Sequence, residues 1–319
     1  MTTITGIPVV DLSQFTKGDA TQQAEFVQQL GQAFTDIGFV SVINHGIPME
    51  KVNAFSAAAE KFFALDKATK VKYEVPGGAG QRGYTSFGKE HAKQSDFGDL
   101  KEFFQIGQEV PEGHALENAY PNNMYTTDYP TFSDLGNQLY REFEKAGSAL
   151  LEAIALFLGL DREYFNKHIE YGNSILRAIH YPPITEEPQS AIRAEEHEDI
   201  NLITLLFGAS AGGLQVRPLG HDWIPVKALG DAFVINVGDM LQRLTNNRLK
   251  STTHRVVNPP REKWGTPRYS IPFFLHPRAD MDLTCLDSCV TEERPLNYEP
   301  IKAGEYLDER LMEIGLLKK

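Results

Sequence analysis

The chain has 319 residues, of which 41% are hydrophobic and 23% are charged, as in an ordinary globular protein long enough to bury a large core. Its 31 basic and 43 acidic residues give a formal net charge of −12, which argues against a nucleic-acid or membrane-surface partner. The first residues lack a signal-peptide pattern, no apolar run could span a bilayer, and Cys285 and Cys289 form no metal-binding pair. We therefore expect a cytoplasmic protein with two free thiols.

The first part of the chain alternates short strands with amphipathic helices. A β-branched run over 7–12 predicts a strand, and apolar residues spaced three and four apart over 22–37 predict a helix. A second strand over 38–48 ends in a turn that holds His45. In such a turn, we interpret His45 as a structural loop residue rather than a ligand.

Helices and one long loop fill the region up to residue 171. We expect a helix that carries Val52 to Phe63, a glycine-rich loop from Val75 to Asp99, and extended chain from Lys101 to Ile106. Loops of this length are often functional. A long helix over 132–158, with an apolar stripe on one face, and a short helix over 162–169 complete the region.

After Gly172 the apolar pattern changes to short runs separated by Gly, Pro and Asn. Such regular spacing is typical of an antiparallel sandwich or jelly roll. A final helix is expected over 305–314. We expect one domain, 1–319, with a helix-rich supporting region (1–171), a catalytic core (172–285) and a C-terminal helix region (286–319). The predicted strands are Ser174–Tyr181, Ile200–Phe207, Leu214–Arg217, Trp223–Val226, Ala232–Val237, Thr252–Val257, Arg268–Leu275 and Met281–Thr284.

A histidine and an aspartate stand at the start of one apolar run. In an extended strand His197 and Asp199 would point to the same face, because side chains alternate between the two faces. An imidazole beside a carboxylate makes half of a site for a divalent metal. Alone the pair is weak evidence, because a chain with nine His and 43 acidic residues contains such pairs by chance.

A third ligand candidate, His254, follows 57 residues after His197 on a later predicted strand. Two histidines and one carboxylate form a facial triad, which leaves coordination positions open for other ligands. This donor set suits Fe(II), whereas structural zinc usually has four protein ligands. The sequence therefore predicts that His197, Asp199 and His254 bind a catalytic metal.

An arginine and a serine follow on the next strand. By strand alternation Arg268, Ser270 and Phe274 share one face. A guanidinium with a hydroxyl two residues later can hold a carboxylate at two points. Tyr181 can donate a hydrogen bond to the same carboxylate, and Arg177 lies on the same face of its strand. We interpret this face as an anchor for a keto-acid cosubstrate.

Several motifs in one order resemble the isopenicillin N synthase-like branch of the Fe(II)/2-oxoglutarate-dependent oxygenases. The resemblance covers nearly the whole chain. The motifs are Ile7-Pro8-Val9-Val10-Asp11, Gly38-Phe39, Asn44-His45-Gly46-Ile47-Pro48, Tyr181-Pro182-Pro183, His197-Glu198-Asp199, Gly213-Leu214-Gln215-Val216, Asn236-Val237-Gly238-Asp239, His254-Arg255-Val256 and Arg268-Tyr269-Ser270.

This resemblance implies a fold and an activity. The fold would be α+β with a mostly β, cupin-like double-stranded β-helix (jelly roll), supported by an N-terminal helical and mixed region and a C-terminal helix. Fe(II) would be bound by His197, Asp199 and His254, and the cosubstrate 2-oxoglutarate by Arg268 and Ser270 with help from Tyr181. With O₂, the enzyme would hydroxylate, desaturate or cyclise a small organic substrate and release succinate and CO₂. We expect a monomer or weak homo-oligomer.

Two alternatives and the substrate remain open. The Arg-x-Ser motif also occurs in iron oxidases of this branch that use no 2-oxoglutarate, of the isopenicillin N synthase or ethylene-forming type. A third possibility is a non-catalytic jelly roll that binds a metal or ligand. Plant members often carry Asn where this chain has Ile179, which puts part of the cosubstrate contacts in doubt. Phe274, Arg177 and Tyr84 are the candidate substrate contacts, although Phe274 could equally be a core residue.

Overall fold

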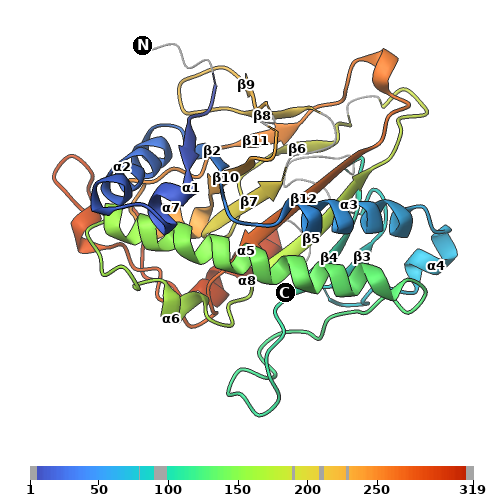
Figure 1. Ribbon diagram of the computed structural model, residues 1–319, viewed down its shortest axis with the longest axis horizontal. Coiled ribbons are helices and arrows are strands. Elements are labelled where there is room, and N and C mark those ends of the chain that lie inside the picture. Colours follow the sequence, from blue (N-terminus) through green and yellow to red (C-terminus); the bar gives the residue numbers. More distant parts are fainter. Residues whose placement is uncertain are drawn as a thin grey trace.

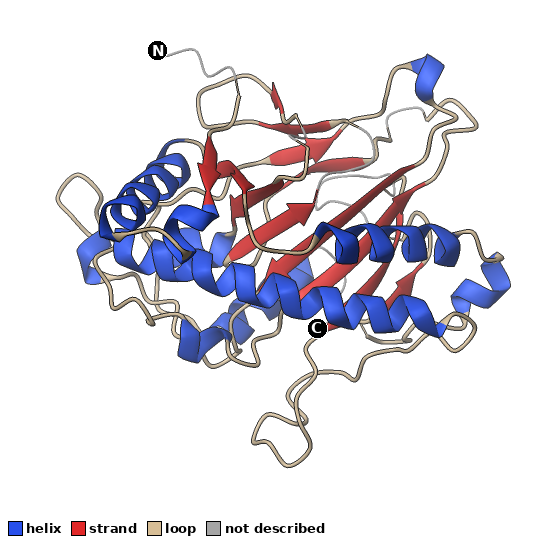
Figure 2. Cartoon of the chain, in the orientation of Figure 1, coloured by secondary structure: helices blue, strands red, loops and turns tan. Residues whose placement is uncertain are grey.

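The protein folds as two β-sheets with helices packed along the outer face of the larger one (Figures 1 and 2). The computed structural model describes residues 6–78, 80–89, 99–188, 191–207, 212–227 and 230–313. The helices are α1 (Leu12–Thr16), α2 (Ala20–Asp36), α3 (Met49–Phe63), α4 (Lys67–Val71), α5 (Pro130–Phe157), α6 (Asn166–Ile169), α7 (Asp239–Leu244) and α8 (Ala303–Glu313). The strands are β1 (Val9–Asp11), β2 (Phe39–Ile43), β3 (Gly83–Thr85), β4 (Glu102–Gly107), β5 (Ile175–Tyr181), β6 (Ala194–His197), β7 (Ile203–Phe207), β8 (Leu214–Val216), β9 (Ile224–Pro225), β10 (Phe233–Val237), β11 (His254–Val256) and β12 (Arg268–Leu275).

The two sheets differ in size. The larger sheet has the order β1-β2-β10-β7-β12-β5-β4-β3, and the smaller one β6-β11-β8-β9. Their strand pairings are antiparallel except that of β1 with β2. The predicted mostly β core of jelly-roll type is confirmed. Strands of the N-terminal half extend both edges of the larger sheet, whereas the predicted division into the regions 1–171, 172–285 and 286–319 stays a prediction.

The long helix α5 lies directly on the larger sheet (Figure 1). Pro130 stands in its first turn, where the missing N–H costs no hydrogen bond. Two glycines allow the close approach: a Cβ on Gly147 would lie 2.3 Å from Leu275 Cδ1, and one on Gly136 would lie 2.2 Å from Ile106 Cδ1. The absent side chains thus let the helix approach the sheet closely at these two positions. No helix in the described part of the chain is both long and apolar enough to cross a membrane.

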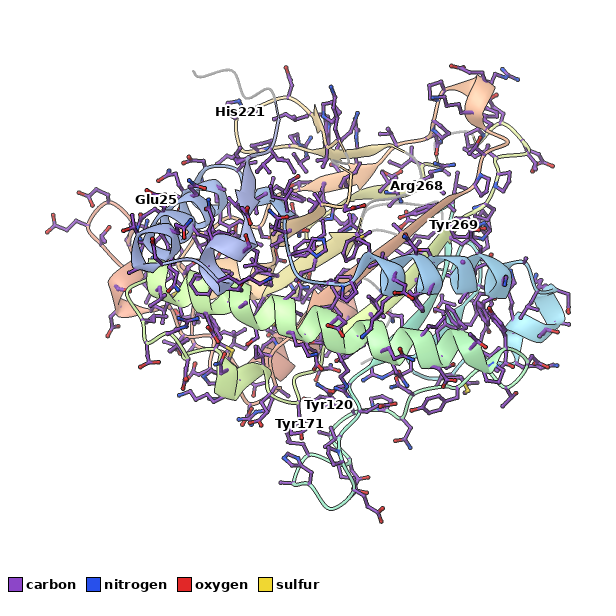
Figure 3. All side chains as sticks on the ribbon, viewed as in Figure 1. Glu25, Tyr120, Tyr171, His221, Arg268 and Tyr269 are labelled. Carbon is purple, nitrogen blue, oxygen red and sulfur yellow. The ribbon has the colours of Figure 1, made fainter. Side chains whose placement is uncertain are left out.

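Strand β12 divides the molecule into a core side and a cavity side. Phe273 points toward the helices, where its ring stacks on that of Phe143 at 5.2 Å between centroids. Arg268, Ser270 and Phe274 line the cavity on the opposite face. In Figure 3, Arg268 and Tyr269 occupy adjacent positions on this strand. Strand alternation therefore separates the apolar packing from the polar groups of the site.

Some predicted elements differ from the structure. Met281–Thr284 is no strand: Asp282 forms only an isolated bridge with Lys302, because no long partner segment continues the pairing. The short elements α4, α7 and β3 were not predicted, since they span too few residues to show a periodic pattern. Residues 79 and 90–98 of the predicted loop, and residue 314 of the final helix, lie outside the described residues.

Candidate functional site

Two histidines face each other across the smaller sheet. His197 ends β6 and His254 begins β11, and the antiparallel register pairs these two residues directly. Their ring centroids are 4.3 Å apart. Residues that are 57 positions apart in the chain therefore come together through one ladder pairing.

Asp199 joins them from a loop, so the prediction that it shares a strand with His197 is wrong. Strand β6 ends at His197, and Asp199 lies in the connection to β7. Its Oδ2 accepts hydrogen bonds from Thr204 Oγ1 at 2.6 Å and from Asn236 Nδ2 at 2.7 Å. Its Oδ1 lies 3.9 Å from His254 Nε2. One carboxylate oxygen is thus fixed by the protein, and the other points toward the imidazoles.

The protonation states suit metal binding. Burial alone would raise the pKa of Asp199, but the nearby charges of His254 and His197 and the two hydrogen bonds keep this pKa below its ordinary value. Burial, with the charge of His197, lowers the pKa of His254 to about 4. At neutral pH the site therefore presents a carboxylate and a neutral imidazole, which are the forms that bind metals.

Backbone carbonyls orient both rings. The Nδ1–H of His197 donates to the carbonyl of Glu195 at 2.6 Å, and that of His254 donates to the carbonyl of Thr252 at 3.1 Å. This arrangement leaves each Nε2 free as a ligand atom. One ligand atom from each of His197, Asp199 and His254 lies within 4.8 Å of the other two. Two imidazole nitrogens and one carboxylate oxygen fit Fe(II) in a facial triad.

The residues of the predicted carboxylate anchor lie on the larger sheet. Arg268 pairs with Tyr181 and Ser270 pairs with Ile179 across β12 and β5. Arg268 Nη1 donates to Ser270 Oγ at 3.3 Å, and its guanidinium carbon lies 4.7 Å from the centre of the Tyr181 ring. Only 1% of Arg268 is exposed. A buried guanidinium beside two hydroxyls fits the distal carboxylate of 2-oxoglutarate.

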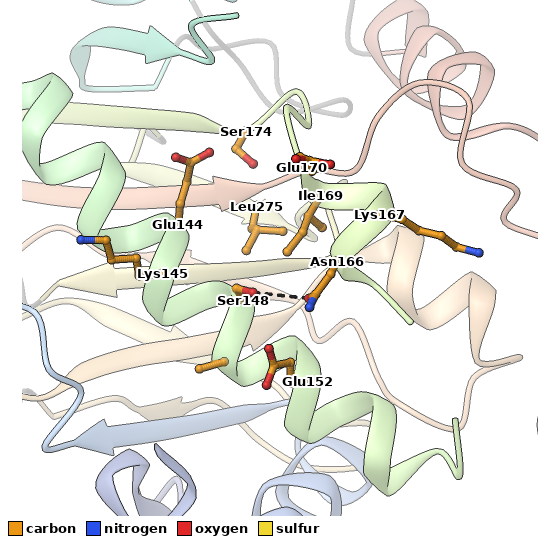
Figure 4. A pocket seen from close by; sticks show the side chains of 11 residues that line it. Glu144, Lys145, Ser148, Glu152, Asn166, Lys167, Ile169, Glu170, Ser174 and Leu275 are labelled. Atoms are coloured by element: carbon orange, nitrogen blue, oxygen red, sulfur yellow. Dashed lines mark hydrogen bonds between the residues drawn. The ribbon is translucent and has the colours of Figure 1, made fainter. Parts of the chain in front are cut away.

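One cavity of about 1020 Å³ joins the triad to this anchor. Residues of both sheets line it, and so do Leu307 and Leu311 of the C-terminal helix α8. Such a volume is ample for a small ligand beside a cosubstrate. A separate groove of about 740 Å³ lies between α5 and α6 (Figure 4), where Ser148 donates a hydrogen bond to Asn166 at 3.4 Å. That groove contains none of the predicted site residues.

Two of the three candidate substrate contacts line the cavity. The guanidinium carbon of Arg177 lies 5.1 Å from the centre of the Phe274 ring and 4.1 Å from that of Phe103. Its Nε donates to Gln105 Oε1 at 2.9 Å. These contacts hold a flat cation beside a flat ring at the cavity wall.

The structure does not bring Tyr84 to this cavity. Its hydroxyl donates to Glu102, which also accepts from Lys70 Nζ at 2.8 Å on the helix side of the sheet. His180 lies 2.7 Å from the same carboxylate. The predicted structural role of His45 fits its contacts, since its Nε2 lies 2.8 Å from the carbonyl of Asp231.

Sequence reasoning missed several groups of the site. Thr204 and Asn236 orient Asp199, and His276 lines the cavity beyond Phe274. Strand alternation could have found His276, which lies two residues after Phe274. The Asp199 partners come from other strands, and only the three-dimensional register brings them together.

The buried His276 predicts a pH dependence of stability. Burial lowers its pKa to about 4, and its Nδ1 has no hydrogen-bond partner among the described residues. The unfolded chain, with a pKa near 6.5, binds a proton earlier, so folding stability falls as pH drops from about 6.5 to 4. We expect His276→Gln to remove up to about 3 kcal/mol of this loss. Urea unfolding of the wild type and the variant, at neutral pH and about two pH units lower, measures the loss of folding stability in each. An equal loss in the two proteins would contradict this role of His276.

Both halves of the chain match known protein families. Residues 7–128 match the family described as non-haem dioxygenase in morphine synthesis N-terminal, and residues 172–277 match the 2OG-Fe(II) oxygenase superfamily. A 2-oxoglutarate-Fe(II) type oxidoreductase of Emericella nidulans is 32% identical over 308 residues, which cover 93% of this chain and 87% of that protein.

Solved structures extend this similarity to the fold. A 2OG-Fe(II) oxygenase family protein from Caulobacter crescentus is 42% identical with a TM-score of 0.87, over 98% of this chain and 100% of that one. A Neurospora crassa protein, solved in complex with alpha-KG and thymine, is 31% identical with a TM-score of 0.85, over 96% of both chains.

Proposed function

We propose that this protein oxidises a small flat organic molecule in the cavity between its two sheets. The chain belongs to the 2OG-Fe(II) oxygenase superfamily and is a non-haem iron dioxygenase that uses 2-oxoglutarate and O₂. In this proposal His197, Asp199 and His254 hold the iron, and Arg268, Ser270 and Tyr181 hold the distal carboxylate of 2-oxoglutarate. The observation that carries it is the ladder pairing of His197 with His254, with Asp199 beside both.

The residues of the chain divide the work. Bound iron and cosubstrate supply the oxidising chemistry, with release of succinate and CO₂. Asp199 stays anionic and oriented through Thr204 and Asn236, and the backbone carbonyls hold each histidine with Nε2 toward the site. Burial of Arg268 favours a carboxylate over water as its partner. Leu206, Leu214, Leu307 and Leu311 add apolar side chains to the cavity wall beside these polar groups.

The substrate class rests on Phe274 and Arg177. Phe274 lines the cavity and can contact a flat ring there, and the guanidinium of Arg177 over the Phe274 ring favours substrates that carry carbonyl oxygens. The Neurospora crassa structure holds thymine together with alpha-KG, and this supports a small flat heterocycle as the class for this chain. The predicted cytoplasmic location and monomeric or weakly homo-oligomeric state stay predictions.

Succinate formation in the presence of a panel of heterocycles, with thymine as the first member, tests this proposal. We expect a compound that stimulates succinate formation with Fe(II) and 2-oxoglutarate above the rate without substrate. Phe274→Leu should then raise KM for that compound roughly tenfold, because aromatic stacking is lost, and leave the affinity for 2-oxoglutarate unchanged.

Tyr269→Leu provides the matched control, because Tyr269 lies on the same strand but stacks on His180 at 4.7 Å on the opposite face. An equal rise of KM in both variants would contradict a substrate contact at Phe274. A panel without any stimulating flat ring would contradict the substrate class.

A further inference from the structure

A second buried guanidinium lies close to Tyr181 and Arg268, behind the residues that line the cavity. Arg193 directly precedes β6, and only 1% of it is exposed. Its guanidinium carbon lies 6.0 Å from the centre of the Tyr181 ring, whereas that of Arg268 lies 4.7 Å from the same ring. Two arginines from different parts of the chain thus approach one phenol.

Among the described residues, no carboxylate pairs with Arg193 to balance its charge. Its Nη2 donates to the carbonyl of Thr266 at 2.9 Å, and its Nε has no hydrogen-bond partner among the described residues. Burial and the like charge of Arg268 both lower the pKa of Arg193. In the described part of the chain, no carboxylate forms an ion pair with Arg193.

Two like charges in a water-poor place repel each other and are costly unless an anion joins them. The position of the pair identifies that anion. In the proposed function Tyr181 and Arg268 anchor the distal carboxylate of 2-oxoglutarate, and Arg193 approaches the same Tyr181 ring and is close enough to Arg268 for the two charges to interact. The charge of Arg193 would act on a carboxylate bound at this anchor through space, and such an interaction is stronger where water is excluded.

We propose that Arg193 is a cosubstrate-positioning residue whose charge, acting beside Arg268 and Tyr181, makes this end of the cavity select 2-oxo acids with a distal carboxylate. This inference rests on the proposed function, in which the same end binds 2-oxoglutarate. If Arg193 had only a structural role, linking Thr266 to β6, its replacement would change the binding of all 2-oxo acids to the same extent.

Two 2-oxo acids separate these roles. 2-Oxopentanoate has the carbon chain of 2-oxoglutarate but lacks the distal carboxylate. Each acid is titrated anaerobically into the Fe(II) protein, and the visible band of the chelated keto acid gives its dissociation constant. The ratio of the two constants measures the preference for the distal carboxylate and does not depend on turnover.

Arg193→Gln removes the charge and keeps a donor for the Thr266 carbonyl. We expect it to weaken 2-oxoglutarate binding roughly tenfold and to leave 2-oxopentanoate unchanged, so that the preference falls roughly tenfold. Arg193→Lys keeps the charge and should keep most of the preference. Arg82→Gln is the matched control, because Arg82 is also 1% exposed but packs on Gly107 at the far end of β4.

The outcomes distinguish this inference from the proposed function. A Gln variant with wild-type preference, an equal loss for both acids, or a Lys variant that loses the preference would overturn the role of Arg193 while the proposed function stands. A wild-type protein that gives no band with 2-oxoglutarate would contradict the proposed function and this inference with it.

Discussion

Replacing Asp199 by alanine is expected to lower turnover by at least about 10³-fold. Loss of a partner that only orients a metal ligand typically costs about 10–100-fold, and loss of a ligand itself should cost more. The two imidazoles would remain without a charge to balance the metal, because Asp199 is the acidic member of the cluster. Succinate formation and Fe(II) titration measure the effect.

A graded series makes this prediction specific. Asn236→Ala removes one hydrogen bond to Asp199 Oδ2 and should cost roughly 10–100-fold in activity or iron affinity. Asp280→Ala removes an exposed carboxylate whose salt bridge is with Arg278, and should change neither. An Asp199→Ala protein with more than about a tenth of wild-type turnover would rule out Asp199 as an essential ligand.

Replacing Arg268 by methionine is expected to weaken 2-oxoglutarate binding by about two to three orders of magnitude. Truncating one partner of a buried charge pair costs about 2–5 kcal/mol. Arg268→Lys should recover little, since an ammonium cannot reproduce the planar fork of donors. Ser270→Ala should cost roughly tenfold, because it removes a single neutral hydroxyl. The anaerobic keto-acid titration measures all three.

Fe(II) affinity provides the internal control for these variants. The proposed anchor lies on the larger sheet, whereas His197 and His254 lie on the smaller one, so the iron dissociation constant should stay within about threefold of wild type. Arg261→Met, at an exposed arginine, should leave both affinities unchanged. If Arg268→Met bound 2-oxoglutarate as tightly as wild type, the anchor would have to lie elsewhere.

The sequence predicted best where a short pattern repeats along one strand. The range Arg268–Leu275 agrees with β12, and its alternation placed Arg268, Ser270 and Phe274 on one face. The three metal-ligand candidates also came together as expected. The predicted 2-oxoglutarate-dependent oxygenase activity is confirmed over the alternatives that the sequence left open. Relatives named for this activity match nearly the whole chain.

Long-range geometry lay beyond the sequence patterns. Strand alternation predicted that Asp199 lies beside His197 on one strand. In the structure β6 ends at His197, and Asp199 lies in the loop that follows. Thr204 and Asn236 reach Asp199 only through the pairing of β7 with β10. Tyr84 was a candidate substrate contact, but it lies on the helix side of the larger sheet, where its hydroxyl donates a hydrogen bond to Glu102. These contacts depend on how strands meet, which local periodicity does not encode.

A crystal structure with Mn²⁺ and 2-oxoglutarate tests the central claim most directly. We predict metal density bound by His197, Asp199 and His254, with the distal carboxylate of 2-oxoglutarate on Arg268 and Ser270 beside Tyr181. Metal at another set of residues, or a distal carboxylate away from Arg268, would contradict the assignment of this cavity as the active site.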